Sequence, residues 1–234
     1  DNWYKLNPEW RVAGTGHRQS PINIITRTAV NGMTVRPPLP LQLFYKASTI
    51  KLINNGHTIQ VDCADLSNTI AIDDRNYALL QFHFHARSEH LIDGKPYPME
   101  LHFVHILSGS TGGPTDKSAA KLAVVGVMIE EGPPNPLIDK LWTKLPQAKD
   151  EKASFAGPGM NFDILLPPPG KRSFFRYYGS LTTPPCSEGV AWTVMQTPIS
   201  ASAEQIAAFT AHYAHNYRPV QPLHDRHLSA GDLH

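Results

Sequence analysis

The stretch Gln81-Phe-His-Phe-His85 decides the fold, together with a second stretch of the same kind, Glu100-Leu-His-Phe-Val-His105. Alternation runs through the histidines of both, with aromatic and β-branched residues nearby, which predicts two β-strands. Because successive side chains of a strand point to opposite faces, we expect His83 and His85 on one face. The polar segment between the two stretches carries turn residues, so it can reverse the chain and bring the second strand beside the first.

A metal site is one interpretation of this hairpin. If the register allows it, His102 joins His83 and His85, and three converging imidazoles fit a catalytic zinc site whose fourth position stays open for water. The alternative is that these are ordinary structural or exposed histidines, because the chain has twelve of them and pairs of this spacing arise by chance. The presence of Gln81 and Glu100 favours the interpretation as a metal site. Each lies two residues before a histidine and so shares its face, where a metal-bound imidazole needs an acceptor.

The composition narrows the classes of function. The 234 residues suit one domain, spanning residues 1–234, with a substantial core. A formal net charge of +1, from 21 basic and 20 acidic residues, argues against nucleic acid or a membrane surface as the main partner. No apolar run approaches the ~18 residues of a membrane span. Two cysteines, Cys63 and Cys186, allow one internal disulfide, two free thiols or an intermolecular bond.

Strand patterns recur along the whole chain. Besides the two histidine stretches, strand candidates cover residues 41–45, 49–53, 58–61, 68–72, 122–129, 173–178 and 190–195. The continuous apolar run at 122–129 is typical of a central strand that is covered on both faces. Asn135 followed by Pro136 predicts the start of a short helix, and Ser202 with Gln205 resembles a capping box that opens a helix to about residue 215. The sequence therefore predicts a β-dominated domain built on a large sheet of around ten strands.

Several separate motifs run in order through nearly the whole chain, from about Trp3 to Leu223. They are Gln19-Ser-Pro21, Asn55-Gly-His57, the two histidine stretches, Ser88-Glu-His90, Leu122-Ala-Val-Val-Gly126, Gly179-Ser-Leu-Thr-Thr-Pro-Pro185 and Asn216-Tyr-Arg-Pro-Val-Gln-Pro222. Together they resemble the α-class carbonic anhydrases, and the short link Ala86-Arg87 looks like the bacterial or algal members. The resemblance implies a β-dominated α+β fold, in which a large twisted, mostly antiparallel central sheet of about ten strands carries short peripheral helices.

The resemblance also implies a catalytic centre. Zinc would be bound by His83, His85 and His102, at the base of a conical cleft. Their outer partners would be Gln81, Glu100 and the backbone carbonyl of Asn216. Zinc in carbonic anhydrase is the standard example of a metal that lowers the pKa of its bound water to about 7. The resemblance implies that this water loses a proton, that the resulting hydroxide attacks CO2, and that another water then displaces bicarbonate from the zinc. Thr182 resembles the hydroxyl that accepts a hydrogen bond from this hydroxide and donates its own to Glu89.

Further residues match the family's paths for substrate and proton. An apolar wall for CO2 would be formed by Val104, Val124, Leu181 and Trp192, beside the polar Thr183. His57 matches the proton shuttle, and a histidine pKa near 6.5 suits proton transfer around neutral pH. Tyr4, Asn55 and Gln60 would order the water chain. Without the resemblance, the apolar residues read as core and His57 as an exposed histidine after a turn.

One departure from the family concerns the cysteines. Many extracellular members pair a cysteine before Gln-Ser-Pro with one after Thr-Thr-Pro-Pro. Cys186 occupies the second position, but Ala13 stands at the first, so we expect the usual disulfide to be absent. Family habit and the start at Asp1, without a methionine, indicate a trimmed chain in a periplasmic or secreted location. The sequence leaves a homodimer open.

Two rival functions deserve comparison with this enzyme. A non-catalytic, carbonic-anhydrase-like binding or storage protein would commonly lack a zinc histidine, whereas all three are present here. A cupin-like metal oxygenase is suggested by His83-x-His85 with Glu89 four residues on. The glycines that flank that motif are missing, because Tyr77 and Pro96 stand in their places. We therefore expect a zinc enzyme that hydrates CO2 reversibly.

Overall fold

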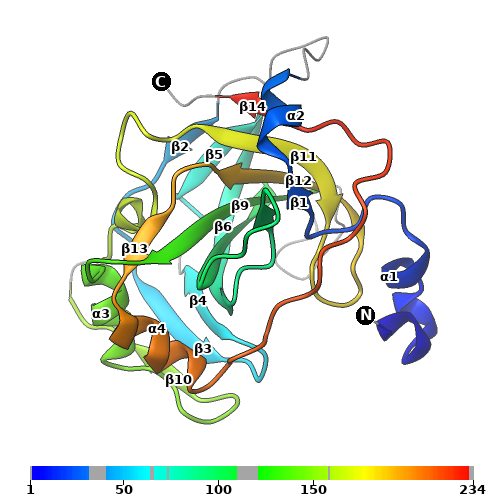
Figure 1. Ribbon diagram of the computed structural model, residues 1–234. Coiled ribbons are helices and arrows are strands. Elements are labelled where there is room, and N and C mark those ends of the chain that lie inside the picture. The colour runs from blue at the N-terminus through cyan, green and yellow to red at the C-terminus, as the bar shows by residue number, and fades with distance from the viewer. Residues whose placement is uncertain are drawn as a thin grey trace.

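The computed structural model in Figure 1 describes residues 2–31, 41–63, 66–72, 74–109, 121–157 and 159–231. Its elements, in chain order, are η1 (Trp3–Lys5), η2 (Pro8–Trp10), α1 (Val12–Thr15), β1 (Asn23–Ile24), α2 (Thr26–Asn31), β2 (Gln42–Phe44), β3 (Ile50–Asn54), β4 (Ile59–Cys63), β5 (Thr69–Ile72), β6 (Arg75–Ala86), β7 (Leu91–Ile92), β8 (Met99–Leu107), β9 (Leu122–Glu131), α3 (Pro136–Trp142), β10 (Lys152–Ser154), η5 (Phe162–Leu165), β11 (Phe174–Ser180), β12 (Glu188–Met195), β13 (Ile199–Ala201), α4 (Ala203–Thr210) and β14 (Ser229–Gly231). No helix among the described residues is long and apolar enough to cross a membrane.

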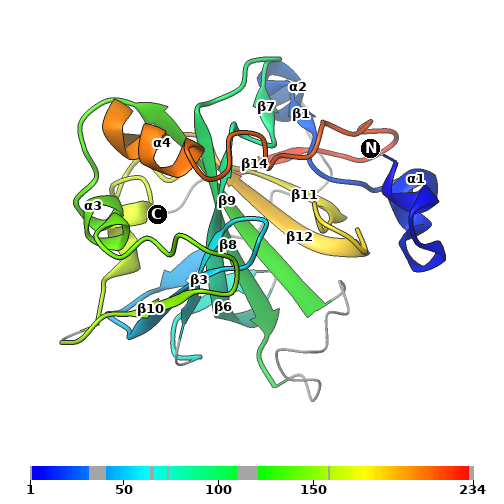
Figure 2. The ribbon, with the colours of Figure 1, turned by 90° about the horizontal axis from the view of Figure 1, so that it is seen from below.

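A twisted sheet runs through the middle of the molecule (Figures 1 and 2). In the described part of the chain it has twelve strands, with the main order β10-β3-β4-β6-β8-β9-β12-β11-β14. Most neighbours are antiparallel, but β12 and β13 both run parallel to β9. The expected large, mostly antiparallel sheet is confirmed, with twelve strands where the sequence suggested about ten. The additional strands are β10, β13 and β14, each of which has only three residues, too few for a repeated alternation in the sequence.

The two faces of strands β6 and β8 carry different side chains. Alternation along β6 and β8 directs Phe82, Phe84 and Phe103 to one face, where all three are fully buried in the larger apolar cluster. Leu141 of α3 and Phe209 of α4 complete this cluster, and both helices lie together on one side of the sheet in both views (Figures 1 and 2). Each buried aromatic or aliphatic side chain stabilises the fold by about 1.5–3 kcal/mol. The opposite face of the same strands is thereby free to carry the histidines.

The central position of β9 and the starts of α3 and α4 agree with the predictions from the sequence. β9 lies between β8 and β12, and residues 122–129 are buried throughout, as the continuous apolar run predicts. The Asn135 side chain accepts hydrogen bonds at the start of α3, and the capping box of Ser202 and Gln205 opens α4. The expected end of α4 near residue 215 is wrong, because the helix ends at Thr210. Phe209 is its last buried residue, and the chain then turns so that Asn216 reaches β6.

Candidate metal centre

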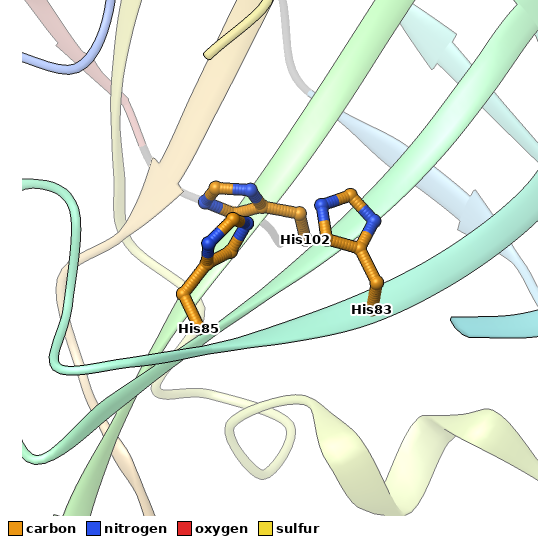
Figure 3. A group of neighbouring side chains, drawn as sticks. All are labelled: His83, His85 and His102. Carbon is orange, nitrogen blue, oxygen red and sulfur yellow. The ribbon is translucent and has the colours of Figure 1, made fainter. Parts of the chain in front are cut away.

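The register of the β6–β8 hairpin brings the three histidines together. His83 lies directly opposite His102 in this antiparallel pair, and directly opposite residues share a face. The ring centroids of His83, His85 and His102 are 5.0, 5.3 and 4.6 Å apart. One ligand atom from each side chain lies within 4.8 Å of the other two. Figure 3 shows the rings of the two neighbouring strands turned toward one common point.

Each histidine uses its second ring nitrogen in a hydrogen bond that fixes its tautomer. The acceptors are Gln81 Oε1, 2.9 Å from His83 Nδ1; the Asn216 carbonyl oxygen, 2.7 Å from His85 Nδ1; and Glu100 Oε1, 2.8 Å from His102 Nε2. Because the ring N–H of each neutral imidazole donates to its acceptor, the other ring nitrogen keeps its lone pair. Those are Nε2 of His83, Nε2 of His85 and Nδ1 of His102. Asn216 also fixes the end of β6, since its side chain accepts a hydrogen bond from the Ala86 N–H.

The Glu100 carboxylate is the most heavily used acceptor of the centre. Its Oε2 accepts the backbone N–H groups of Glu89 and His90 at 2.8 Å each. Its Oε1 accepts His90 Nδ1 at 2.7 Å and His102 Nε2 at 2.8 Å. Glu100 therefore connects the segment between β6 and β8 to His102, one of the three converging histidines. The side chain is fully buried, so all four donors are satisfied without water.

Burial and neighbouring charges set the protonation of these groups. Burial, followed by repulsion from the other two rings, lowers the pKa of His83 well below its usual range, and burial likewise lowers the pKa of His85. Burial alone would also lower the pKa of His102, but the adjacent carboxylates outweigh it and raise the pKa. Burial would raise the pKa of Glu100, but the histidines beside it outweigh burial and hold the pKa well below its usual value. Glu100 is thus an ionised acceptor, and His83 and His85 are the neutral imidazoles that a metal requires.

Glu89 lies next to the histidines with one oxygen occupied and one unused. Its Oε1 accepts the Arg218 backbone N–H at 2.8 Å, whereas its Oε2 is buried without a hydrogen-bond partner. Oε2 lies 3.8 Å from His102 Nδ1, which is too long for a hydrogen bond. Thr182 is buried, but the expected hydrogen bond from its hydroxyl to Glu89 is not among those that the described residues form. The structure thus leaves a buried acceptor in need of a donor.

A buried polar network behind the centre includes residues to which the sequence analysis assigned no role. His90 Nε2 lies 2.7 Å from the Tyr177 hydroxyl, which in turn lies 2.9 Å from Ser20 Oγ. Arg218 is buried as well, and its guanidinium donates to Gln19 Oε1, Ser20 O and Ala13 O. The sequence pointed to these residues only by including Gln19, Ser20 and Arg218 in the motifs quoted above, and it did not indicate what they contact. His90, Glu100 and His102 also lie close enough together to hold an ion, but Glu100 and Tyr177 occupy both ring nitrogens of His90.

Gly126 is a further residue without an assigned role in the sequence. It lies opposite His102 on β9, and a Cβ atom there would come within 3.1 Å of Glu100 Oε1. A contact that close requires the carboxylate to shift. Glycine at this position therefore leaves room for the acceptor that orients His102.

The residues expected to line a CO2 wall lie on the histidine face. Val124 and Trp192 are buried in the smaller apolar cluster, and Val104 and Leu181 pack against it half-buried. The Trp192 ring centroid is 4.9 Å from that of His102, and its Nε1 donates to Ser180 O at 2.9 Å. Thr183 is exposed. The structure thus brings an apolar surface directly against one of the three histidines.

Of the four residues expected to form the path for the proton, the structure brings only three close together. Gln60 on β4 pairs with His83, and the Asn55 side chain donates to Gln60 Oε1 at 3.2 Å. His57 is exposed, and its backbone N–H donates to Asn55 Oδ1 at 2.9 Å. Tyr4 lies in the N-terminal segment against Gly14, and it forms no hydrogen bond to Asn55 or Gln60 within the described residues. The His57 turn is therefore joined to Asn55 and Gln60, and Gln60 lies opposite His83 in the sheet, whereas Tyr4 is not joined to either amide.

Cys63 and Cys186 are not joined by a disulfide in the structure, which rules out the internal bond among the alternatives that the sequence left open. Cys186 is fully buried, and burial raises the pKa of its thiol to about 11. It therefore stays protonated around neutral pH and takes no part in metal binding.

The donor set fits zinc. Three imidazoles, each oriented by an outer acceptor, are one of the ligand sets of catalytic zinc, and His102, whose pKa is raised, would release a proton on binding the metal. His85 Nε2 is buried without any hydrogen-bond partner, an arrangement that costs free energy unless another group satisfies the nitrogen. A cation at the common point of the three rings would do so. Because glutamate is an acceptor only, the unpartnered Glu89 Oε2 marks the side from which a proton donor completes the site.

Comparisons with known proteins agree with this geometry. The family model described as eukaryotic-type carbonic anhydrase matches residues 1–231. A carbonic anhydrase of Pectobacterium carotovorum is 42% identical over 227 residues, which cover 96% of this chain and 84% of that protein. The solved structure of α-carbonic anhydrase from Thermovibrio ammonificans, in complex with the inhibitor sulfanilamide, is 36% identical with a TM-score of 0.86 and covers 97% of this chain and 93% of that one. A structure of dioscorin complexed with ascorbate is 27% identical with a TM-score of 0.84, covering 100% and 93%.

Proposed function

The chain belongs to the eukaryotic-type carbonic anhydrase family, the α class, and from this premise we propose that it is a zinc enzyme that interconverts CO2 and bicarbonate with a histidine as proton shuttle. The observation that carries the proposal is the set of three converging imidazoles, each held by its own acceptor. Family membership alone is weaker support, because a similar fold is shared with the structure named dioscorin.

His83, His85 and His102 would hold zinc through the nitrogens that face one another. When bound, zinc supplies a water whose pKa is lowered to about 7, and so a nucleophile at neutral pH. The outer acceptors serve this purpose by keeping the rings in one orientation and one tautomer. Glu100 adds a negative charge next to His102, which makes that imidazole a more basic and so stronger metal ligand.

Glu89 and Thr182 would orient the nucleophile. Glu89 can only accept when ionised, and its Oε2 lacks a partner, so a rotation of the buried Thr182 hydroxyl toward it would satisfy both groups. The Thr182 oxygen is then left as an acceptor for the nucleophile, whose remaining lone pair is turned toward the carbon of CO2. Arg218 fixes Glu89 from behind through its backbone N–H.

The apolar wall would bind CO2 without strong contacts. Val104, Val124, Leu181 and Trp192 offer no charge to the substrate, and they displace water from the side of the site next to His102. A small apolar molecule gains from such a surface, whereas the charged product bicarbonate does not. Thr183 would face the polar side of the pocket. This asymmetry favours entry of CO2 and release of the anion.

His57 would carry the released proton to buffer. It is exposed, so it can exchange protons with solvent, and its turn is bonded to Asn55, whose side chain reaches Gln60, the residue opposite His83 in the sheet. Both amide side chains can hold ordered water between the centre and His57. Tyr4 would contribute only from the far side of such a water chain, since no direct contact joins it to the amides.

Metal analysis combined with a CO2 hydration assay on the purified chain tests the proposal. We expect one zinc per chain, rapid hydration measured by stopped flow, loss of both on chelation, and recovery on adding zinc. A chain with zinc but without hydration activity would support a non-catalytic relative. Iron or manganese in place of zinc would support a metal oxygenase. We also propose a periplasmic or secreted location and a homodimer, which cell fractionation and sedimentation analysis test.

A further inference from the structure

Two exposed histidines outside the metal centre, His17 and His224, face one another. Their ring centroids are 5.1 Å apart, and the ring planes are inclined by 50°. The three ring pairs of the metal centre are 4.6, 5.0 and 5.3 Å apart, with one pair inclined by 49°. His17 and His224 are therefore as close to one another as the histidine rings of the candidate metal centre are. We propose that they form a second, peripheral binding site for a divalent transition-metal ion.

Both histidines lie on segments whose backbone is held in place. Directly after His17, the Arg18 backbone N–H donates to Glu188 Oε1 at 2.7 Å. Around His224, the Arg226 side chain donates to Leu223 O at 2.9 Å and to Pro222 O at 2.6 Å. Because the chain on both sides is fixed by these bonds, an ion would have to order only the two imidazole side chains. The loss of conformational entropy on binding is then small.

The same two segments also converge on the buried Arg218. Its guanidinium donates to Gln19, two residues after His17, and its own position in the chain lies six residues before His224. An ion between the histidines would thus link the N-terminal and C-terminal segments that together support Glu89 through Arg218. This link distinguishes the pair from two histidines on independent surface loops.

The chemistry of the pair selects the class of ion. Imidazole nitrogen suits Cu²⁺, Ni²⁺ and Zn²⁺, whereas Mg²⁺ and Ca²⁺ prefer oxygen ligands. Among the described residues, no third histidine, cysteine or carboxylate completes a cluster around this pair. The remaining coordination positions would therefore be filled by water, which both exposed side chains permit. We expect the site to bind more weakly than the catalytic centre and to favour Cu²⁺, in keeping with the general affinity order of divalent metals.

Charged residues adjoin both histidines in the chain. Arg18 follows His17 directly, and Asp225 and Arg226 follow His224. Arg226 is acted on by the carboxylates of Glu188 and Asp225 as well as by Arg18, so the two cations next to the pair have carboxylates near them.

Copper binding to the zinc-loaded protein tests the site. Titration with Cu²⁺, followed by electron paramagnetic resonance and by zinc analysis, should show one ion bound to imidazole nitrogens while the catalytic zinc stays in place. His17→Ala and His224→Ala should each weaken this binding at least about tenfold, since loss of a mere outer partner already costs about 10- to 100-fold in metal affinity. His227→Ala is the matched control, because this exposed histidine lies three residues from His224 and outside the pair. It should bind copper like the unaltered protein.

Three results would overturn the proposal: no copper bound beyond the catalytic ion, copper binding unchanged in both His17→Ala and His224→Ala, or an equal loss in His227→Ala. CO2 hydration by zinc-loaded His17→Ala and His224→Ala should equal that of the unaltered protein, which shows that these variants are folded. The proposal does not depend on the catalytic activity, so either can fail alone.

Discussion

Replacing Glu100 by glutamine should damage both the stability of the fold and the affinity for zinc. The carboxylate accepts four hydrogen bonds from fully buried donors. Glutamine has a single acceptor oxygen, and its amide group would face further N–H donors, so at most two of the four bonds survive. Each lost bond to a buried charged group costs about 1.5–3 kcal/mol. The expected destabilisation by Glu100→Gln is therefore about 3–6 kcal/mol.

Zinc affinity should fall in the same variant because His102 loses its charged acceptor, by about 10- to 100-fold. Urea unfolding of the metal-free proteins measures the first effect, and titration against a competing chelator measures the second. Glu188→Gln is the matched control. Glu188 accepts from Arg18 N and Gln19 Nε2 through Oε1 alone, which an amide oxygen can replace. A Glu100→Gln variant as stable as Glu188→Gln, with unchanged zinc affinity, would refute the role assigned to this carboxylate.

Three further predictions concern the mechanism and the fold. His57→Ala should slow turnover on the order of 100-fold in dilute buffer, with partial recovery in imidazole-type buffers, because a positioned proton carrier is lost; equal rates for both proteins at all buffer concentrations would contradict the shuttle. Thr182→Val should lower kcat/KM about 100-fold while zinc stays bound, and Thr182→Ser should stay near the original rate, since it keeps the orienting hydroxyl; an active Thr182→Val would remove Thr182 from the mechanism. Burial lowers the pKa of His105 to about 3, so between about pH 6.5 and pH 3 the unfolded chain binds a proton that the folded chain does not. The stability present above pH 6.5 should then be lost as the pH falls, by up to about 1.4 kcal/mol per pH unit from this residue alone. The pH dependence of urea unfolding of the metal-free protein should flatten in His105→Gln, and parallel curves would argue against this assignment.

Much of the architecture follows from simple periodicity. Alternation placed phenylalanines and histidines on opposite faces of β6 and β8, and only one register buries all the phenylalanines while bringing His102 opposite His83. The acceptors Gln81 and Glu100 were predictable for the same reason, since a spacing of two residues keeps a side chain on its partner's face. The three-residue strands β10, β13 and β14 escaped detection because so few positions hardly display a period, whereas β2, of the same length, lies inside the candidate at 41–45.

The contacts that depend on distant loops could not be derived from local pattern. The Asn216 acceptor is a backbone carbonyl, which has no side-chain signature, and it lies 131 residues from His85. Arg218 reaches Glu89 across 129 residues, also through its backbone. The resemblance to a family implied the role of the Asn216 carbonyl, whereas the contact between Arg218 and Glu89 was not predicted. The contacts of Glu100 with the Glu89 and His90 backbone arise in an irregular link, where no periodic rule applies.

The location of the metal is the most direct test of the whole account. Crystals of the purified protein, measured at the zinc absorption edge, should give one strong anomalous peak bound by His83 Nε2, His85 Nε2 and His102 Nδ1 at about 2.0–2.1 Å, with a fourth, non-protein position. A peak bound by other residues, or these three nitrogens without any metal in a protein that nonetheless hydrates CO2, would contradict it.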